Sequence, residues 1–450
     1  RNLQSLDLSS FSVQNVENMA SMFRYTTSLQ SLDLSNFVTT KVKTMDSIFS
    51  FCSAQKIDIT GFDTKNVENM SRMFNGANEL KSIDLSNFDT TKVTEVQSMF
   101  EGCEVIEKIQ FSDKFKCSKC TTMESLFANC QLLESLDLAY FDTSRVTNMK
   151  SMFRGMKKLT SLDLSNLDIS SVKDLALWFN DCGDLQKLDT SKLIGTNVLS
   201  MQSSFDGCTS LKSLDLSNFG GKNVQTWFRA FQKCYNLTDL VLTGIDTSNT
   251  EYFNEMFSMC EKLKKIDVSN FNTKKASNMQ AMFFQCKSLT SLDLRHFVTK
   301  NVNSFESMFQ NCEQLKYLDV SSFEGTNTGS ISYMFSGCIS LKSIQLTNFD
   351  SKSLRRMLNA FNGCESLTSL EFPKMTTSQV SNFDGIFFNC RNLEKLDLSN
   401  WDTAQSGTFE KTFCNCTALT SIDISNQFDT SYGKYFASMF EGCESLVNLD

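Results

Sequence analysis

The chain contains a single proline, Pro373, among its 450 residues, and no stretch rich in glycine and serine or in charges of one sign interrupts it. Such stretches are where domains are usually joined. Their absence predicts one domain over residues 1–450. Because the sequence opens and closes inside a repeating pattern, we expect this domain to be a piece of a longer chain.

Histidine is almost missing, since His296 is the one histidine in the chain. Catalytic triads need a histidine as general base, and histidine-rich metal sites need several of them. The phosphate-binding motifs G-x-G-x-x-G and G-x-x-x-x-G-K-S/T are absent as well. The sequence therefore predicts no enzyme, no catalytic residue, no cofactor and no metal site.

An excess of basic residues and a long apolar run are also lacking. The formal net charge is −8, whereas a protein that binds nucleic acid needs a basic stripe against the phosphates. No apolar run approaches the roughly 20 residues of a membrane-spanning helix. We therefore expect neither a nucleic-acid partner nor insertion of this segment into a membrane.

One motif recurs about every 26 residues, of the form L-x-x-L-D-L-S-N-F-D-T-x-x-V-x-x-M-x-x-M-F-x-x-C. In L-D-L two apolar residues flank a charged one, which is the period of a strand with one buried face. Asp142–Ser144 resembles a helix N-cap. The apolar residues after it have the spacings of one helix face: Val146, Met149, Met152 and Phe153. One such unit cannot bury its apolar face alone, so the pattern predicts an α/β solenoid of about 17 turns, each a short parallel strand plus a short helical segment.

Two columns of the repeat are predicted to form the structural core. The phenylalanine before the cysteine position recurs in every turn, which indicates a stacked aromatic spine that includes Phe127, Phe153, Phe179, Phe205, Phe231, Phe257, Phe283 and Phe309. Most of the 17 cysteines share the period of the repeat. We interpret them as buried free thiols that pack as small apolar side chains, among them Cys208, Cys234, Cys260 and Cys286.

The outward strand position forms an acidic ladder, with members at Asp137, Asp163, Asp189, Asp215, Asp267, Asp293 and Asp319. Carboxylates about 5 Å apart repel by roughly 0.8 kcal/mol in water, so something is expected to offset the repulsion. Flanking lysines, bound cations and a basic partner are the candidates. Two interpretations remain open. The aspartates either keep an exposed sheet soluble, or they bind a cationic ligand or divalent ions. The neighbouring column of serine and threonine would supply hydroxyls to a glycan.

The unit S-L-D-L-x-x-F-D-T-x-x-V-x-x-M-x-x-M-F, seen in Ser135–Phe153, resembles the 26-residue repeat of BspA-like leucine-rich-repeat surface proteins. The resemblance covers essentially the whole chain. It implies a right-handed leucine-rich-repeat-like solenoid, a cell-surface or extracellular location, and adhesion to or recognition of a protein or glycan ligand on a cell or matrix surface. We expect the acidic ladder to carry that recognition.

The alternative is a structural component of an extracellular fibre or matrix that assembles end to end. Terminal repeats of a solenoid normally carry polar caps. Leu3 and Leu6 at one end and Leu446 and Leu449 at the other instead look like ordinary core residues. Open apolar ends of this kind favour self-association.

Overall fold

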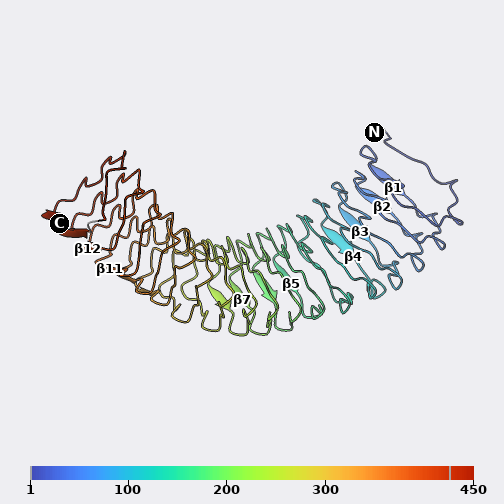
Figure 1. The fold of residues 1–450 in the computed structure, drawn as a ribbon. Helices are drawn as coiled ribbons and strands as arrows, with labels where there is room; N and C mark the ends of the chain where they lie inside the picture. Colours follow the sequence, from blue (N-terminus) through green and yellow to red (C-terminus); the bar gives the residue numbers. More distant parts are fainter. Residues whose placement is uncertain (1–2, 425–426, 450) are drawn as a thin grey trace. The chain divides into compact units, whose positions relative to one another are not determined.

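The computed structural model describes residues 3–424 and 427–449. The chain divides into two compact units, Arg1–Gly221 (unit 1) and Lys222–Asp450 (unit 2), and each is a solenoid of stacked turns (Figure 1). The turns number about 15 in all, with about 26 residues each, which is fewer than predicted. That both units belong to a single domain over residues 1–450 stays a prediction.

Short strands mark successive turns of each unit. Unit 1 contains β1 (Ser31–Asp33), β2 (Lys56–Asp58), β3 (Ser82–Asp84), β4 (Lys108–Gln110), β5 (Ser161–Asp163), β6 (Lys187–Asp189) and β7 (Ser213–Asp215). Unit 2 contains β8 (Asp239–Val241), β9 (Leu318–Asp319), β10 (Ser343–Gln345), β11 (Ser369–Glu371), β12 (Lys395–Leu398), β13 (Ser421–Ile424) and β14 (Asn448–Leu449).

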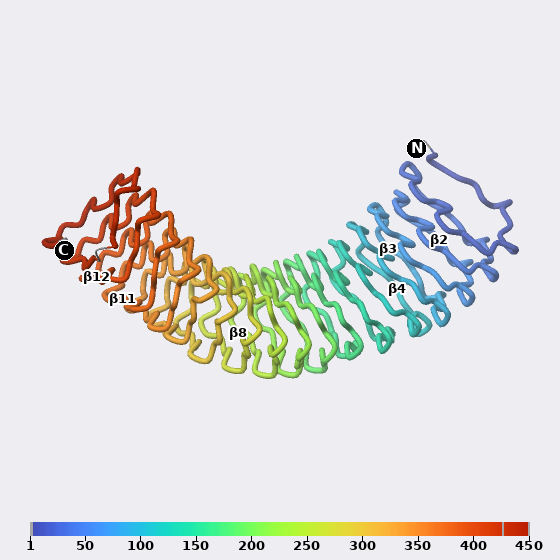
Figure 2. The backbone as a smooth tube through the Cα atoms, viewed as in Figure 1, coloured from blue at the N-terminus to red at the C-terminus, as the bar shows by residue number. Residues whose placement is uncertain are grey.

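Neighbouring strands pair in parallel and in register with the repeat. In β5 and β6, Leu162 lies opposite Leu188 and Asp163 opposite Asp189, so like residues stack upon like. A second row of parallel bridges runs through each unit at another side of the turn, as between Asn148 and Asp174. The trace in Figure 2 shows how β2, β3 and β4 succeed one another, each one turn further along unit 1. Backbone groups of one turn are therefore satisfied largely by the next turn.

The predicted helical segments are wrong: no helix occurs in residues 3–424 or 427–449. Within 149–155 two residues have left-handed backbone, Ser151 at φ 57° and Gly155 at φ 69°, and a helix cannot accommodate them. Alternate amides donate to the next turn, as from Ser151 to the carbonyl of Ala176 (2.9 Å) and from Phe153 to that of Trp178 (3.0 Å). The three-residue spacing comes instead from successive tight turns, such as the one closed by Met152 N–H on the Met149 carbonyl (3.1 Å).

The D-T pair of the motif is a link between turns and not a helix cap. The Thr143 side chain is 1 % exposed. Its hydroxyl donates to the carbonyl of Asp168 (3.0 Å) and accepts the amide hydrogen of the same residue (2.8 Å). Equivalent two-way bonds join Thr39 to Asp63 and Thr247 to Asn272. A buried hydroxyl that bonds twice to the backbone has its polarity satisfied and also fixes the register of the next turn.

The phenylalanine and cysteine columns fill the interior. All eight core phenylalanines named above are at most 1 % exposed. Their rings stack within each unit, as between Phe153 and Phe179 (5.0 Å) in unit 1 and between Phe283 and Phe309 (5.9 Å) in unit 2. Cys208, Cys234, Cys260 and Cys286 are fully buried and form no disulfide.

Most column cysteines also donate a hydrogen bond to the turn before them. The thiol of Cys286 donates to the carbonyl of Phe257 at 3.2 Å, and Cys260 does the same to Phe231. Burial raises the pKa of Cys286 to about 12, so the group keeps the proton that this bond requires. The cysteine column therefore satisfies a row of buried carbonyls while it packs the core.

Apolar side chains of the first and last described turns are exposed. Leu3 and Leu6 are 44 % and 36 % exposed, and Phe436 is 39 % exposed. Leu446 is half-buried, and the side chain of Leu449 lies outside those described. End-to-end assembly stays a prediction.

Replacement of a spine ring is expected to cost far more stability than replacement of a surface ring. Phe309 is fully buried between Phe283 and Phe335, at 5.9 and 5.6 Å. We expect Phe309→Ala to lower the free energy of unfolding by about 3–5 kcal/mol because it opens a core cavity. Phe51→Ala, at a residue that is 39 % exposed, is the control. Urea unfolding of both variants measures the difference, and equal losses would contradict a stacked core.

Alanine substitutions of the left-handed glycines are expected to cost different amounts of stability, depending on which atoms of the neighbouring turn face each glycine. Gly337 (φ +74°) and Gly363 (φ +71°) share one backbone conformation. A Cβ on Gly337 would overlap Oδ1 of Asn311, whereas one on Gly363 would meet its nearest atom, the Gly337 nitrogen, at 3.6 Å. We expect Gly363→Ala to cost about 1–2 kcal/mol, the penalty of a left-handed residue with a Cβ, and Gly337→Ala to cost more. Asn311 is itself left-handed (φ 59°), so Asn311→Gly removes the overlapping amide without placing alanine in that conformation. Adding Asn311→Gly to Gly337→Ala should bring the loss in urea unfolding, relative to Asn311→Gly alone, down to that of Gly363→Ala; an unchanged loss would exclude the overlap.

Candidate functional site

The ladder aspartates all lie at the outward position of their turns. Asp163, Asp189, Asp215 and Asp319 end strands β5, β6, β7 and β9, and Asp137, Asp267 and Asp293 hold the same repeat position outside the assigned strands. Six of the seven are exposed, and Asp319 is half-buried. One stretch of the ladder therefore belongs to unit 1 and one to unit 2. We call the surface that the ladder occupies in each unit the ladder face.

Every ladder aspartate also closes a turn, which the sequence reasoning missed. Oδ1 of Asp163 accepts the amide hydrogen of Ser165 at 2.8 Å, two residues further on. The same bond recurs at Asp137, Asp189, Asp215, Asp267, Asp293 and Asp319, with distances from 2.8 to 3.2 Å. This is an Asx turn, and the aspartate two residues before serine was the signal for it. One carboxylate oxygen thus has a structural role, and the second remains for solvent, a neighbouring side chain or a ligand.

Hydrogen bonding outweighs repulsion along the ladder. The amide and then the hydroxyl of Ser165 lower the pKa of Asp163, and the opposing effect of the Asp189 charge is smaller. The Ser191 hydroxyl and amide lower the pKa of Asp189. A folded-state pKa below the unfolded value means that these bonds stabilise the fold at neutral pH, and that their contribution is lost as the pH falls through the lowered value. Asp163 and Asp189 are therefore anionic at neutral pH.

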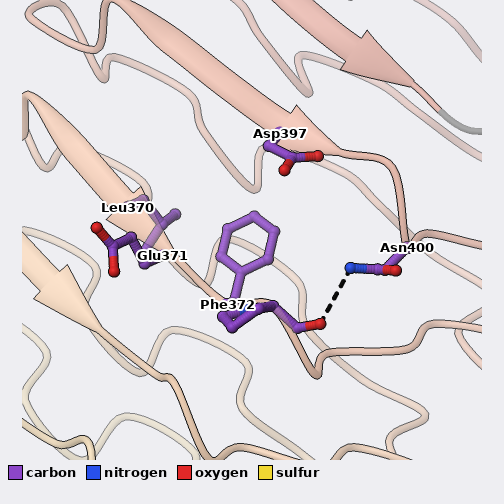
Figure 3. A pocket seen from close by; sticks show the side chains of 6 residues that line it. Leu370, Glu371, Phe372, Asp397 and Asn400 are labelled. Carbon is purple, nitrogen blue, oxygen red and sulfur yellow. Dashed lines mark hydrogen bonds between the residues drawn. The ribbon is translucent and has the colours of Figure 1, made fainter.

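One interruption of the ladder lacks the amide that the Asx turn needs. At the end of β11 the ladder position holds Glu371, and the residue two places on is Pro373, which has no amide hydrogen to donate. In Figure 3 Glu371 points away from Asp397 of the next turn, and the Asn400 side chain donates to the carbonyl of Pro373 at 3.0 Å. The asparagine bond between turns is retained even where the Asx turn is not.

The lone histidine belongs to this asparagine column. Nε2 of His296 lies 3.0 Å from the carbonyl of Val268. Asn270 makes the equivalent bond to the carbonyl of Leu242, also at 3.0 Å. His296 therefore takes the place of a structural asparagine.

The described residues contain neither a cluster of metal ligands nor a membrane-spanning helix. Throughout 3–424 and 427–449 no three histidine, cysteine, aspartate or glutamate side chains are grouped so as to hold a metal ion. Cys117 and Cys120, which form the C-x-x-C pair of the sequence, are fully buried. The same residues contain no helix with the length and apolar character needed to span a bilayer.

Loss of a ladder carboxylate is expected to free the amide that it binds. We expect Asp163→Ala to speed hydrogen exchange at the Ser165 amide, because the bond of 2.8 Å is lost. Asp163→Asn keeps an acceptor oxygen and should leave exchange near the wild-type rate. Exchange measured by mass spectrometry on peptides that cover 161–166 tests this, with the Ser217 amide as an internal control. Identical exchange of the Ser165 amide in both variants would contradict the structural role of Asp163.

A known protein family has a sequence model that matches the repeat along the chain. The sequence model of the family described as "Mycoplasma protein of unknown function, DUF285" matches residues 1–110, 106–219, 199–320, 225–349 and 329–449. A search of curated proteins gave no significant match.

Solved structures that resemble the chain include leucine-rich-repeat proteins. A leucine-rich repeat protein from Bacteroides ovatus is 17 % identical, with 82 % of this chain and 87 % of that chain covered and a TM-score of 0.49. A leucine rich cell surface protein from Faecalibacterium prausnitzii is 16 % identical, with 82 % and 83 % covered and a TM-score of 0.34. The resemblance to BspA-like leucine-rich-repeat proteins is confirmed. Because the five family matches together span residues 1–449 without a gap, the chain belongs to the family described as "Mycoplasma protein of unknown function, DUF285".

Proposed function

We propose that this chain is a non-enzymatic recognition protein that acts in adhesion or ligand binding at a cell surface or in the extracellular space. The ladder face is the binding surface, and its ligand is a protein or a glycan on a cell or matrix. The observation that carries the proposal is the row of exposed, ionised aspartates held at one position of successive turns. Repeat proteins commonly bind partners over an extended surface of this kind.

The Asx turns support this proposal by giving the ladder a fixed geometry. Each carboxylate is held by an amide two residues away, so its orientation is set before a ligand arrives. A preorganised row of acceptors loses less conformational entropy on binding than a row of mobile side chains. Charged ligand groups along such a row would also speed association, in a salt-dependent manner.

The ladder of unit 1 is expected to be necessary for binding. We would replace Asp163, Asp189 and Asp215 together by asparagine, which retains the turn acceptors and removes three charges. The control replaces Asp89, Asp142 and Asp168 by asparagine. These residues close equivalent turns at another corner, through the amides of Thr91, Ser144 and Ser170. Both triple variants therefore change the net charge equally.

The measurement is binding of the purified chain to an array of immobilised neutral glycans and lysine-rich peptides, at low and at physiological salt. We expect the wild type to bind at least one class, and the ladder variant to bind about tenfold more weakly or worse. The control variant should bind like the wild type. Absence of binding to either class, or equal loss in both variants, would refute the ladder as the binding surface.

A further inference from the structure

Two departures from the repeat occur together on the ladder face of unit 2. The residue before the strand leucine is serine or lysine in most turns, but at position 317 it is tyrosine, the one aromatic residue in that column. The residue two places after the ladder aspartate is serine or threonine in most turns, but at position 295 it is arginine, the one basic residue in that column. Tyr317 and Arg295 belong to consecutive turns.

A hollow opens between these departures. We call it the Ser291 notch and define it by the residues Lys265, Ser291, Tyr317, Asp267, Asp293 and Asp319, all of which line it. Lys265, Ser291 and Tyr317 occupy one column in three successive turns, so the short serine lies between two long side chains. With strands about 4.8 Å apart, the outer two side chains start about 10 Å from one another. That width accommodates one six-membered ring.

The aromatic wall of the notch is open to solvent. Tyr317 is 64 % exposed, the highest value among the large apolar and aromatic side chains of the described residues apart from Val447. An exposed aromatic ring offers an apolar face next to a polar hydroxyl. The opposite wall is Lys265, which donates hydrogen bonds and cannot accept them.

The carboxylates of the notch are held ionised and differ in what they can still accept. The Arg295 guanidinium binds both carboxylate oxygens of Asp293. Its Nε donates to Oδ1 at 3.0 Å, and a terminal nitrogen donates to Oδ2 at 2.7 Å. Hydrogen bonds from Ser269 and Ser321 lower the pKa of Asp267 and Asp319 respectively. Asp293 is therefore paired with Arg295, whereas Asp267 and Asp319, in the turns on either side, can still accept hydrogen bonds from a ligand.

We infer that the Ser291 notch binds a single neutral sugar ring of a glycan, which stacks on Tyr317 and hydrogen-bonds through its hydroxyls to Asp267, Asp319 and Lys265. The inference rests on the proposed function, because it names a ligand class for the ladder face in unit 2. A pyranose has an apolar face for the aromatic ring and hydroxyls that both donate and accept. The notch presents acceptors, a donor and an aromatic surface within the width of one ring.

Other ligand classes fit the notch less well. A metal cation would meet the ammonium of Lys265 and the guanidinium of Arg295, and an anion would meet three carboxylates. A purely apolar group would leave those charges desolvated without partners. A neutral polyhydroxyl ring satisfies charges of both signs.

The test uses the whole chain with three probes: methyl β-D-glucopyranoside, methyl β-D-galactopyranoside and N,N′,N″-triacetylchitotriose. Saturation-transfer NMR detects contact, and titration gives the affinity. We expect at least one probe to bind the wild type, Tyr317→Ala to weaken it about tenfold or more, and Tyr317→Phe to retain most of the affinity. Ser291→Lys, which fills the notch with the side chain that the preceding turn carries at this position (Lys265), should abolish binding.

Tyr252→Ala is the matched control, because Tyr252 is 45 % exposed and lies at the bridge position beside Asn278, away from the notch. It should bind the sugar like the wild type. The inference is overturned if none of the three probes binds, if Tyr252→Ala weakens binding as much as Tyr317→Ala, or if a lysine-rich peptide and no sugar occupies the notch. These outcomes are separate from the test of the proposed function, since that test alters only unit 1.

Discussion

The fold depends on hydrogen bonds between corresponding residues of successive turns. A turn of about 26 residues with a strand of two to four residues cannot satisfy its own backbone, so its amides and carbonyls bond to the turns on either side. Such bonding fixes the register at one whole repeat. Like side chains must then lie above like side chains, and each column of the sequence becomes a column in space, as with Leu162 over Leu188. The phenylalanine spine, the cysteine row and the aspartate ladder all follow from this one constraint.

The polar residues of the motif act mainly on the backbone. Asp163 closes a turn, Thr143 bonds twice to the following turn, and His296 occupies a position where other turns use asparagine. Even the thiols, such as that of Cys286, donate to a buried carbonyl. A residue that recurs in every turn therefore has a structural reason to recur, and recurrence alone does not mark a ligand site. Departures from the repeat are more informative, because the backbone has no need of Tyr317 or Arg295.

The aspartate ladder has a structural role and a proposed role in recognition. Its structural role explains why an aspartate stands two residues before an amide donor, and the Asx turn is absent where that donor is Pro373. Its proposed role in recognition uses the second oxygen of each carboxylate and the exposed surface around it. The two roles are compatible, since a carboxylate fixed by a turn amide is also a preorganised acceptor for a ligand. The hydrogen bonds that lower the pKa of Asp163 and Asp189 keep both roles active at neutral pH.

The repeat, the parallel strands and the inward and outward columns follow from the order of residues alone, because side chains that recur with one period must share one environment when turns stack. The sequence also indicated that the cysteines pack as free thiols. It did not determine the backbone between Val146 and Met156, where the apolar spacing of a helix and that of successive tight turns coincide. Only the tertiary structure decided this, since left-handed residues such as Ser151 are stable there through bonds to the next turn, to Ala176, which no local pattern reveals. For the same reason the Ser291 notch became apparent only when residues 26 positions apart were placed side by side.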